Sequence, residues 1–250
     1  MHHRRAGPAA VCVILAVGAA APAVACGAAL ADVADVAAIT DGRTLVLSDG
    51  RELRLAAIEV TEASRAAVER LVTGQTLTIR PAAGATDRYG RVVAFVHLPG
   101  AAESVQQILL DEGLARVSAR VDDRACAGIL LKAEQAARAA GRGHWADPNF
   151  APLKAENPAG IVAKRGHFAL VEGKVLSVRE SGATIYVNFG RRWTRDFTVT
   201  ILKRTERTFA SAGLQPKRLE GRQIRVRGWV EQRGGPAIAA LAPGQIEILD

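Results

Sequence analysis

Residues 44–58, TLVLSDGRELRLAAI, decide the fold of the first half of the chain. Two short runs of β-type residues flank Asp49-Gly50, a pair typical of a tight hairpin turn. In the second run Leu53 and Leu55 alternate with less apolar neighbours, which is the period of a strand with one buried face. The stretch therefore predicts two antiparallel strands, the second over residues 51–58.

More strands and helices surround this hairpin. Similar runs predict three further strands, at residues 36–39, 75–80 and 92–98. Helical periodicity predicts three helices that end near a glycine, at residues 63–72, 104–112 and 126–140. Five strands with three helices predict a small closed barrel with helices packed outside.

The second half is predicted to be another β-rich unit, residues 167–250, after a connector at 148–166 that prolines and glycines interrupt. Its β-type runs lie at residues 170–178, 184–189, 196–202, 223–231, 237–241 and 245–249. One helical run separates the third from the fourth, which is the layout of an oligonucleotide-binding (OB) barrel. The predicted class is therefore α+β, mainly β, with two five-stranded OB-type barrels.

Residues 1–31 are predicted to be a signal peptide. Arg4 and Arg5 precede an apolar run, and small residues form A-x-A cleavage patterns that end at Ala25 and Ala31. The run is short and weakly hydrophobic for a membrane span, so none is expected in the mature chain; a retained anchor is the alternative. We therefore expect an exported protein, periplasmic or secreted.

Which cysteines remain in the mature chain depends on where the signal peptide is cleaved. Cleavage after Ala25 would leave Cys26 as the first mature residue, a placement that permits a lipid anchor. Cleavage after Ala31 would remove Cys26 and leave Cys126 as a lone thiol, predicted to be a buried small hydrophobic residue. The sequence has no CxxC pair or Cys/His cluster, which disfavours a zinc site.

The composition indicates a globular, basic protein. Hydrophobic residues make up 49% and charged residues 23% of 250 residues, which disfavours a disordered chain. Lys and Arg total 33 against 25 Asp and Glu, a formal charge of +8. This excess favours polyanionic partners such as nucleic acid, although a role in solubility alone is the alternative.

Four segments carry a family resemblance: TDGRT at residues 40–44, RLAAIEVTE at 54–62, DRYGR at 87–91 and GLA at 113–115. In order and spacing they resemble the staphylococcal nuclease (thermonuclease) family, and the resemblance covers residues 32–147. A helix followed by Gly-x-Trp, ending at Trp145, also fits. The block at residues 219–249 more distantly resembles bacterial OB-fold domains that bind nucleic acid.

The resemblance implies Ca²⁺-dependent hydrolysis of phosphodiesters in DNA and RNA. The family's catalytic residues fall on Arg54, Glu62 and Arg91. These residue types suit the reaction, because a carboxylate can orient or deprotonate water and two guanidinium groups can neutralise the five-coordinate transition state.

The same resemblance places the metal ligands on Glu59 and the carbonyl of Val60, with Asp41 nearby. Arg43, however, stands where the family has an acidic ligand. Calcium prefers anionic and neutral oxygen ligands, and a guanidinium group repels it. The sequence therefore predicts weak or absent Ca²⁺ binding, with Arg43 paired to neighbouring carboxylates or supplying positive charge to the substrate phosphate.

Substrate contacts are predicted on both units. In the first unit we assign Arg43, Arg88 and Tyr89. In the second, Arg192 and Trp193 belong to a basic cluster with aromatic residues, typical of a groove that follows a single strand. Ordinary barrel packing and a solvated loop are the alternatives.

Three functions are compatible with these residues. The first is an exported nuclease-like phosphodiesterase with an appended OB module. The second is an inactive protein on the same folds that binds nucleic acid or the cell envelope. The third is an envelope structural protein with no role in nucleic-acid binding.

Overall fold

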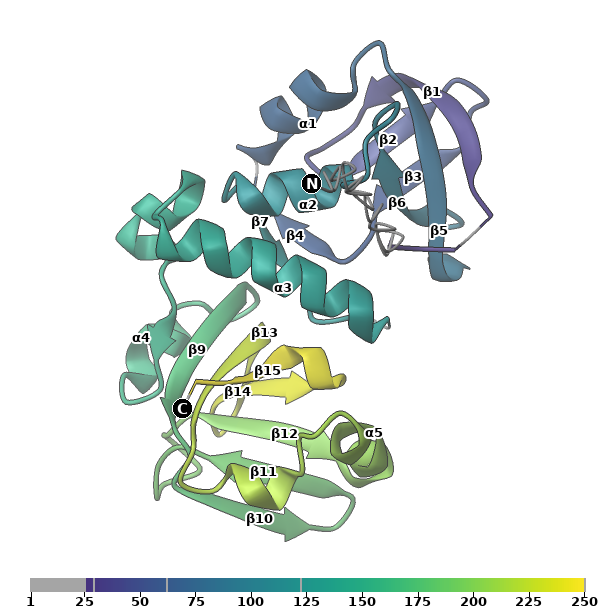
Figure 1. Ribbon diagram of the computed structural model, residues 1–250. Coiled ribbons are helices and arrows are strands. Elements are labelled where there is room, and N and C mark those ends of the chain that lie inside the picture. The colour runs from purple at the N-terminus through teal and green to yellow at the C-terminus, as the bar shows by residue number, and fades with distance from the viewer. Residues whose placement is uncertain (1–25, 29, 62, 122, 250) are drawn as a thin grey trace, which may run out of the picture.

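The computed structural model describes residues 26–28, 30–61, 63–121 and 123–249. The chain forms two β-rich units, and helix α3 (Arg124–Ala139) lies between them (Figure 1). The predicted signal peptide lies almost wholly outside the described residues. Within the described part of the chain, no helix is long and apolar enough to cross a membrane.

The first unit is a closed five-stranded barrel, as predicted. Its strands, in barrel order, are β1 (Asp32–Ile39), β2 (Thr44–Leu47), β3 (Glu52–Leu55), β6 (Val92–His97) and β5 (Thr76–Thr86). Leu53 and Leu55 are buried in the barrel core, while Arg54 between them is only half-buried. Helices α1 (Ser64–Val72) and α2 (Val105–Asp111) pack outside the barrel together with α3, which confirms the predicted arrangement.

The strand predicted over residues 51–58 is interrupted. The chain bends at Ala57, whose φ of 61° lies in the left-handed region that non-glycine residues rarely adopt. The Ala57 carbonyl accepts a hydrogen bond from the Ser118 amide at 2.8 Å, which holds the bend. As a result β4 (Ile58–Val60) leaves the barrel and pairs with β7 (Ala115–Val117) in a separate two-stranded ladder.

The second unit is a half-barrel, so the predicted closed five-stranded barrel is wrong in this detail. Its sheet follows the order β10 (Ser177–Ser181), β11 (Thr184–Asn188), β12 (Thr198–Leu202), β14 (Gly235–Ala240), β13 (Gln223–Arg233), β9 (Phe168–Lys174) and β8 (Leu153–Lys154). A further strand, β15 (Ile246–Ile248), pairs with β13. The parallel β12–β14 pair and helix α5 (Glu206–Ser211) between β12 and β13 keep the OB-type order.

The predicted first strand of this unit is broken. The run predicted as one strand over residues 170–178 breaks at Val175 and Leu176 into β9 and β10. The Val175 amide bonds the carbonyl of Arg222, whereas the Leu176 amide bonds the carbonyl of Asn188. Consecutive amides thus bond to different parts of the sheet: β9 continues along β13, whereas β10 continues along β11.

The predicted connector at residues 148–166 is structured. It contains β8, which pairs in parallel with β9, and helix α4 (Pro158–Val162). Ile161 of this helix is fully buried in the core of the second unit. Its prolines and glycines therefore shape a packed segment of the second unit and do not mark a flexible linker.

A buried ionic cluster joins the two units. Arg227 of β13 and Glu134 of α3 are both fully buried and form an ion pair with a 2.7 Å N–O distance. Arg227 also bonds Glu247 of β15 at 2.6 Å and the Val117 carbonyl of β7 at 3.1 Å. Burial alone would lower the pKa of Arg227, but the charges of Glu134 and Glu247 raise it above its ordinary value.

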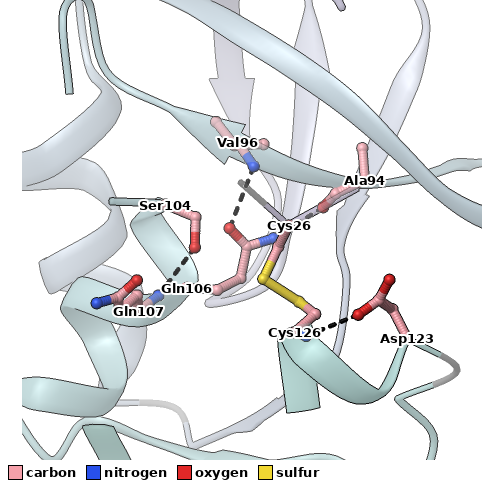
Figure 2. Close-up of a disulfide and its surroundings, with 8 residues drawn as sticks. All are labelled: Cys26, Ala94, Val96, Ser104, Gln106, Gln107, Asp123 and Cys126. Carbon is pink, nitrogen blue, oxygen red and sulfur yellow. Dashed lines mark hydrogen bonds between the residues drawn. A yellow bond between two sulfur atoms is a disulfide. The ribbon is translucent and has the colours of Figure 1, made fainter. Parts of the chain in front are cut away.

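A disulfide joins Cys26 to Cys126 in the first turn of α3 (Figure 2). Cys126 is buried, as predicted, but it is bonded to Cys26 and is not the lone thiol expected for cleavage after Ala31. After Cys26, the Ala28 amide bonds the Pro81 carbonyl, so the chain start lies along β5. The bond therefore ties the beginning of the described chain to the helix between the two units.

Candidate functional site

The β2–β3 hairpin and β4 bring Arg43 and Glu59 together. The Arg43 Nη1 atom donates to the Ile58 carbonyl at 2.6 Å and to the Glu59 carboxylate. Both side chains are less than one-fifth exposed. The Asp41 carboxylate accepts from the backbone amide of Arg43 at 2.7 Å, whereas the guanidinium group of Arg43 bonds to Glu59. Glu59 is thus the carboxylate that neutralises Arg43.

Arg54 lies beside this pair on β3, where it is opposite Thr44 of β2 and Val93 of β6. Its guanidinium group has no hydrogen-bond or ion-pair partner among the described residues. Partial burial lowers its pKa most, and the charges of Arg43 and Arg91 lower it further. The charges of Glu59 and Asp41 oppose this lowering, but within the described ranges neither bonds to Arg54, so Arg54 is a partly desolvated cation that favours binding of an anion.

Arg91 is held by the turn at residues 87–91. Its Nε atom donates to the Asp87 carboxylate at 2.8 Å, and the same carboxylate accepts from the Tyr89 and Arg91 amides. Gly90, with a φ of 80°, supplies the left-handed residue that this turn needs. The hydrogen bond from Arg91 is the main reason that the pKa of Asp87 lies below its ordinary value.

Tyr89 protrudes from the same turn and is 67% exposed. Arg88 lies over its ring at 4.7 Å and donates to its hydroxyl at 2.6 Å, and Arg91 lies 5.2 Å from the ring centroid. An exposed ring between two guanidinium groups can stack on a base while the cations contact phosphate.

The segment that carries Glu62 begins next to this site, but Glu62 itself lies outside the described residues. The Thr61 hydroxyl is 2.9 Å from the His144 Nε2 atom. The backbone amide of Thr61 donates to the Ser64 hydroxyl at 3.0 Å. His144 belongs to η1 (Gly143–Ala146), and burial lowers its pKa. The sequence reasoning missed His144, although the Gly-x-Trp segment that contains it was recognised.

Residues 52–147, from β3 to just after η1, match a family model described as staphylococcal nuclease homologue. The first domain is staphylococcal-nuclease-like. A search of curated proteins finds no match for the chain. The match supports a nuclease-family function in general, and this family binds nucleic acid and generally uses Ca²⁺.

The ligands of the nuclease-like domain do not fit a calcium ion. Of the predicted set, Glu59 is engaged by Arg43, and Val60 lies opposite Ala115 in the β4–β7 ladder. A cation already occupies the position where an acidic ligand would face the metal, and its charge opposes a second cation. Within the described ranges no cluster of three His, Cys, Asp or Glu residues could hold a metal.

Arg192 and Trp193 are not part of this arrangement. They lie in the second unit, in the loop between β11 and β12. The structure therefore groups Arg43, Arg54, Arg91, Asp41 and Glu59 in the nuclease-like domain and leaves the two residues of the second unit on a separate surface.

Another group that the sequence reasoning missed is Arg116 of β7, directly opposite Glu59 in the ladder. It donates to the carbonyls of Phe150 and Phe168 at 2.5 and 3.2 Å, and it lies 3.5 Å above the Phe150 ring. Burial lowers its pKa to about 10. Arg116 thus ties the strand that borders the site to the second unit.

Proposed function

We propose that the nuclease-like domain binds a phosphodiester of nucleic acid between Arg54 and Arg91 and hydrolyses it with Glu62 as general base. The observation that carries the proposal is Arg54, a half-buried guanidinium group without a described partner, close enough to Arg43 and Arg91 for their charges to lower its pKa. Arg43 and Arg91 are paired with Glu59 and Asp87, so Arg54 is the cation most available to stabilise an anion there.

The chemistry assigns each residue a role. Glu62 removes a proton from water, or orients it, for in-line attack on phosphorus. Arg54 and Arg91 donate forked hydrogen bonds to the oxygens whose charge increases in the transition state. Tyr89 and Arg88, exposed on the same turn, contact the flanking base and phosphate.

In this proposal Arg43 supplies part of the positive charge that a metal would otherwise supply. Its pairing with Glu59 reduces the field that it adds, and one guanidinium group stabilises less charge than a divalent ion. The expected enzyme is therefore slow and tolerates chelators.

The test is cleavage of single-stranded DNA in the presence of a chelator. We expect Glu62→Gln to lower turnover with little change in binding, and Arg91→Ala to lower turnover by about 10²-fold or more. Arg54→Lys should also be damaging, because lysine cannot form the planar fork. Arg51→Ala is the matched control, since Arg51 pairs with Asp32 and Asp49 outside the site. Equal rates for all four variants and the unmodified protein would show that the site assignment is wrong.

Arg43→Asp tests the replacement of the metal. The change alters the local charge by two units, releases Glu59 and adds an oxygen ligand. We expect calorimetric titration to show Ca²⁺ binding by this variant and little or none by the unmodified protein. Arg43→Asn is the control that removes the cation without adding a charged ligand, and it should bind more weakly than Arg43→Asp. Tight Ca²⁺ binding by the unmodified protein, with activity abolished by chelator, would contradict this interpretation.

An inactive nucleic-acid-binding protein is the second candidate. The Arg43–Glu59 ion pair favours it, because this pair uses up a carboxylate that would serve a metal. In that case the chelator assay shows no cleavage by any variant, while Arg54→Ala still weakens binding to single-stranded DNA.

We also propose that the protein is exported and that its mature chain begins at Cys26. Disulfides persist in oxidising compartments, and cleavage after Ala31 would remove one partner of the Cys26–Cys126 bond. A lipid anchor on Cys26 would require the same sulfur atom, so the disulfide argues against it. Mass spectrometry of the native protein should give a chain that starts at Cys26, carries no acyl group and gains two hydrogen atoms on reduction. A mass that begins at Met1 or Asp32 would refute the proposal.

A further inference from the structure

The loop between β11 and β12 presents an aromatic side chain to solvent. Trp193 is 69% exposed, the most exposed tryptophan among the described residues. Arg191, Arg192 and Arg195 surround it in sequence, and all three are exposed. The guanidinium groups of Arg191 and Arg192 have no hydrogen-bond or ion-pair partner in the part of the chain that the structure describes.

The loop is internally braced. The Asp196 carboxylate accepts from the Arg192 amide at 2.8 Å, and the Arg192 carbonyl accepts from the Asp196 amide at 2.7 Å. Gly190 packs against the Asp196 side chain so closely that no other residue fits there without a shift. These contacts fix the backbone from which Trp193 protrudes.

The β13–β14 turn contacts the loop and supports it. The Gly235 amide donates to the Trp193 carbonyl at 3.1 Å. A side chain on Gly234 would place its Cβ atom 2.9 Å from the Trp193 ring, so the indole lies directly on this glycine. The six-membered ring of the indole thus lies against the turn, which supports the side chain while it stays exposed.

The same turn adds further positive charge. Arg233 is exposed at its tip and pairs with Glu231, and Arg165 contacts the neighbouring Gln232 at 3.3 Å. Three exposed arginines therefore flank the supported tryptophan in its own loop, Arg191, Arg192 and Arg195, and the neighbouring turn carries Arg233. The nearby carboxylates of Asp196 and Glu231 are engaged with the loop and with Arg233.

We propose that the loop of residues 190–196, with the β13–β14 turn, is a second binding site, for single-stranded nucleic acid. A supported, exposed indole offers a stacking surface for an unpaired base, and free guanidinium groups beside it bind the adjacent phosphates. A duplex keeps its bases stacked inside and offers no such face. This site does not depend on hydrolysis by the first domain.

The test measures binding of a fluorescein-labelled oligothymidylate of twelve nucleotides by anisotropy, in the full chain with Glu62→Gln present to prevent turnover. We expect Trp193→Ala to raise Kd at least about fivefold. The double variant Arg191→Ala and Arg192→Ala should also raise Kd and reduce the slope of log Kd against log salt by roughly 0.7 per lost phosphate contact. Arg207→Ala is the matched control, because Arg207 is exposed on α5, which follows the other end of β12 (Figure 1), and it should change Kd less than twofold.

The outcomes separate this site from the first domain. Retained binding in Arg54→Ala with loss in Trp193→Ala supports the second site, whether or not the protein cleaves DNA. Loss in Arg54→Ala with no effect of Trp193→Ala overturns it and leaves the proposed function intact. No binding by the parent chain, equal affinity for a duplex of the same length, or stronger binding to anionic vesicles that also requires Trp193 would likewise overturn it. The variants at Trp193, Arg191, Arg192 and Arg207 should keep the parent's thermal unfolding midpoint, since these side chains are exposed.

Discussion

Replacing Glu134 by alanine is expected to lower the free energy of unfolding by about 3–5 kcal/mol, because the change leaves a fully buried cation without its main partner. Arg227 would keep its bond to Glu247 but lose both bonds to Glu134, at 3.1 and 2.7 Å. The Val117 amide, which donates to Glu134 at 3.0 Å, would lose its acceptor as well. Urea denaturation followed by fluorescence measures the loss.

Two comparison variants distinguish the effect of burying an ion pair from the effect of the ion pair itself on the free energy of unfolding. Glu69→Ala removes a pair with Arg65 in which both side chains are nearly half exposed, and it should cost less than about 1 kcal/mol. The double change Glu134→Leu and Arg227→Met should recover the part of the loss that comes from the unpaired cation, since an apolar pair needs no counter-ion, while the Val117 amide and carbonyl stay unpaired. A cost below about 1 kcal/mol for Glu134→Ala would show that water reaches the cluster and that the two units are joined more loosely.

The double variant Cys26→Ser and Cys126→Ser is expected to be less stable than the unmodified protein by about 2–5 kcal/mol. The bond spans 100 residues of sequence, and closing so long a loop removes many conformations from the unfolded chain. Both cysteines are buried, so the serine hydroxyls add a further cost. Denaturation midpoints with and without dithiothreitol measure the effect.

The serine variant is its own control, since its midpoint should not respond to reductant. Titration of the unfolded, unreduced protein should find no free thiol at Cys26 or Cys126. Equal midpoints for the unmodified protein with and without dithiothreitol, or two reactive thiols per mature chain, would contradict the disulfide.

Local pattern was sufficient for the first barrel. Asp49-Gly50 and the alternating leucines at positions 53 and 55 place the β2–β3 hairpin, because turn preference and one buried face are properties of neighbouring residues. The same local pattern did not predict the bend at Ala57, which ends the strand predicted over residues 51–58. No pattern of neighbouring residues predicts a positive φ at an alanine. Here a hydrogen bond from the amide of Ser118, 61 residues later in the chain, holds Ala57 in this conformation.

The second unit shows a similar division. Its strands and its single helix lie close to the predicted runs, since alternation and glycine turns mark them. The break between β9 and β10 does not follow from those runs, because it depends on distant partners: the Val175 amide bonds Arg222 and the Leu176 amide bonds Asn188. The burial of Ile161 could not be predicted, because this residue lies in a stretch rich in proline and glycine. That composition fits both a linker and a packed turn.

For the site, the sequence by itself determined the residue types and the segments that carry them: Arg54, Arg91, the Asp87 turn and the substitution at Arg43. Those choices follow from chemistry that is local to each segment. Only the tertiary structure decided which charges meet. It paired Arg43 with Glu59 and not with Asp41, left Arg54 without a described partner, and joined Cys26 to Cys126 and Arg227 to Glu134. Such pairings depend on the distance between segments far apart in the chain, and that distance is set by how the barrel, the ladder and α3 pack together.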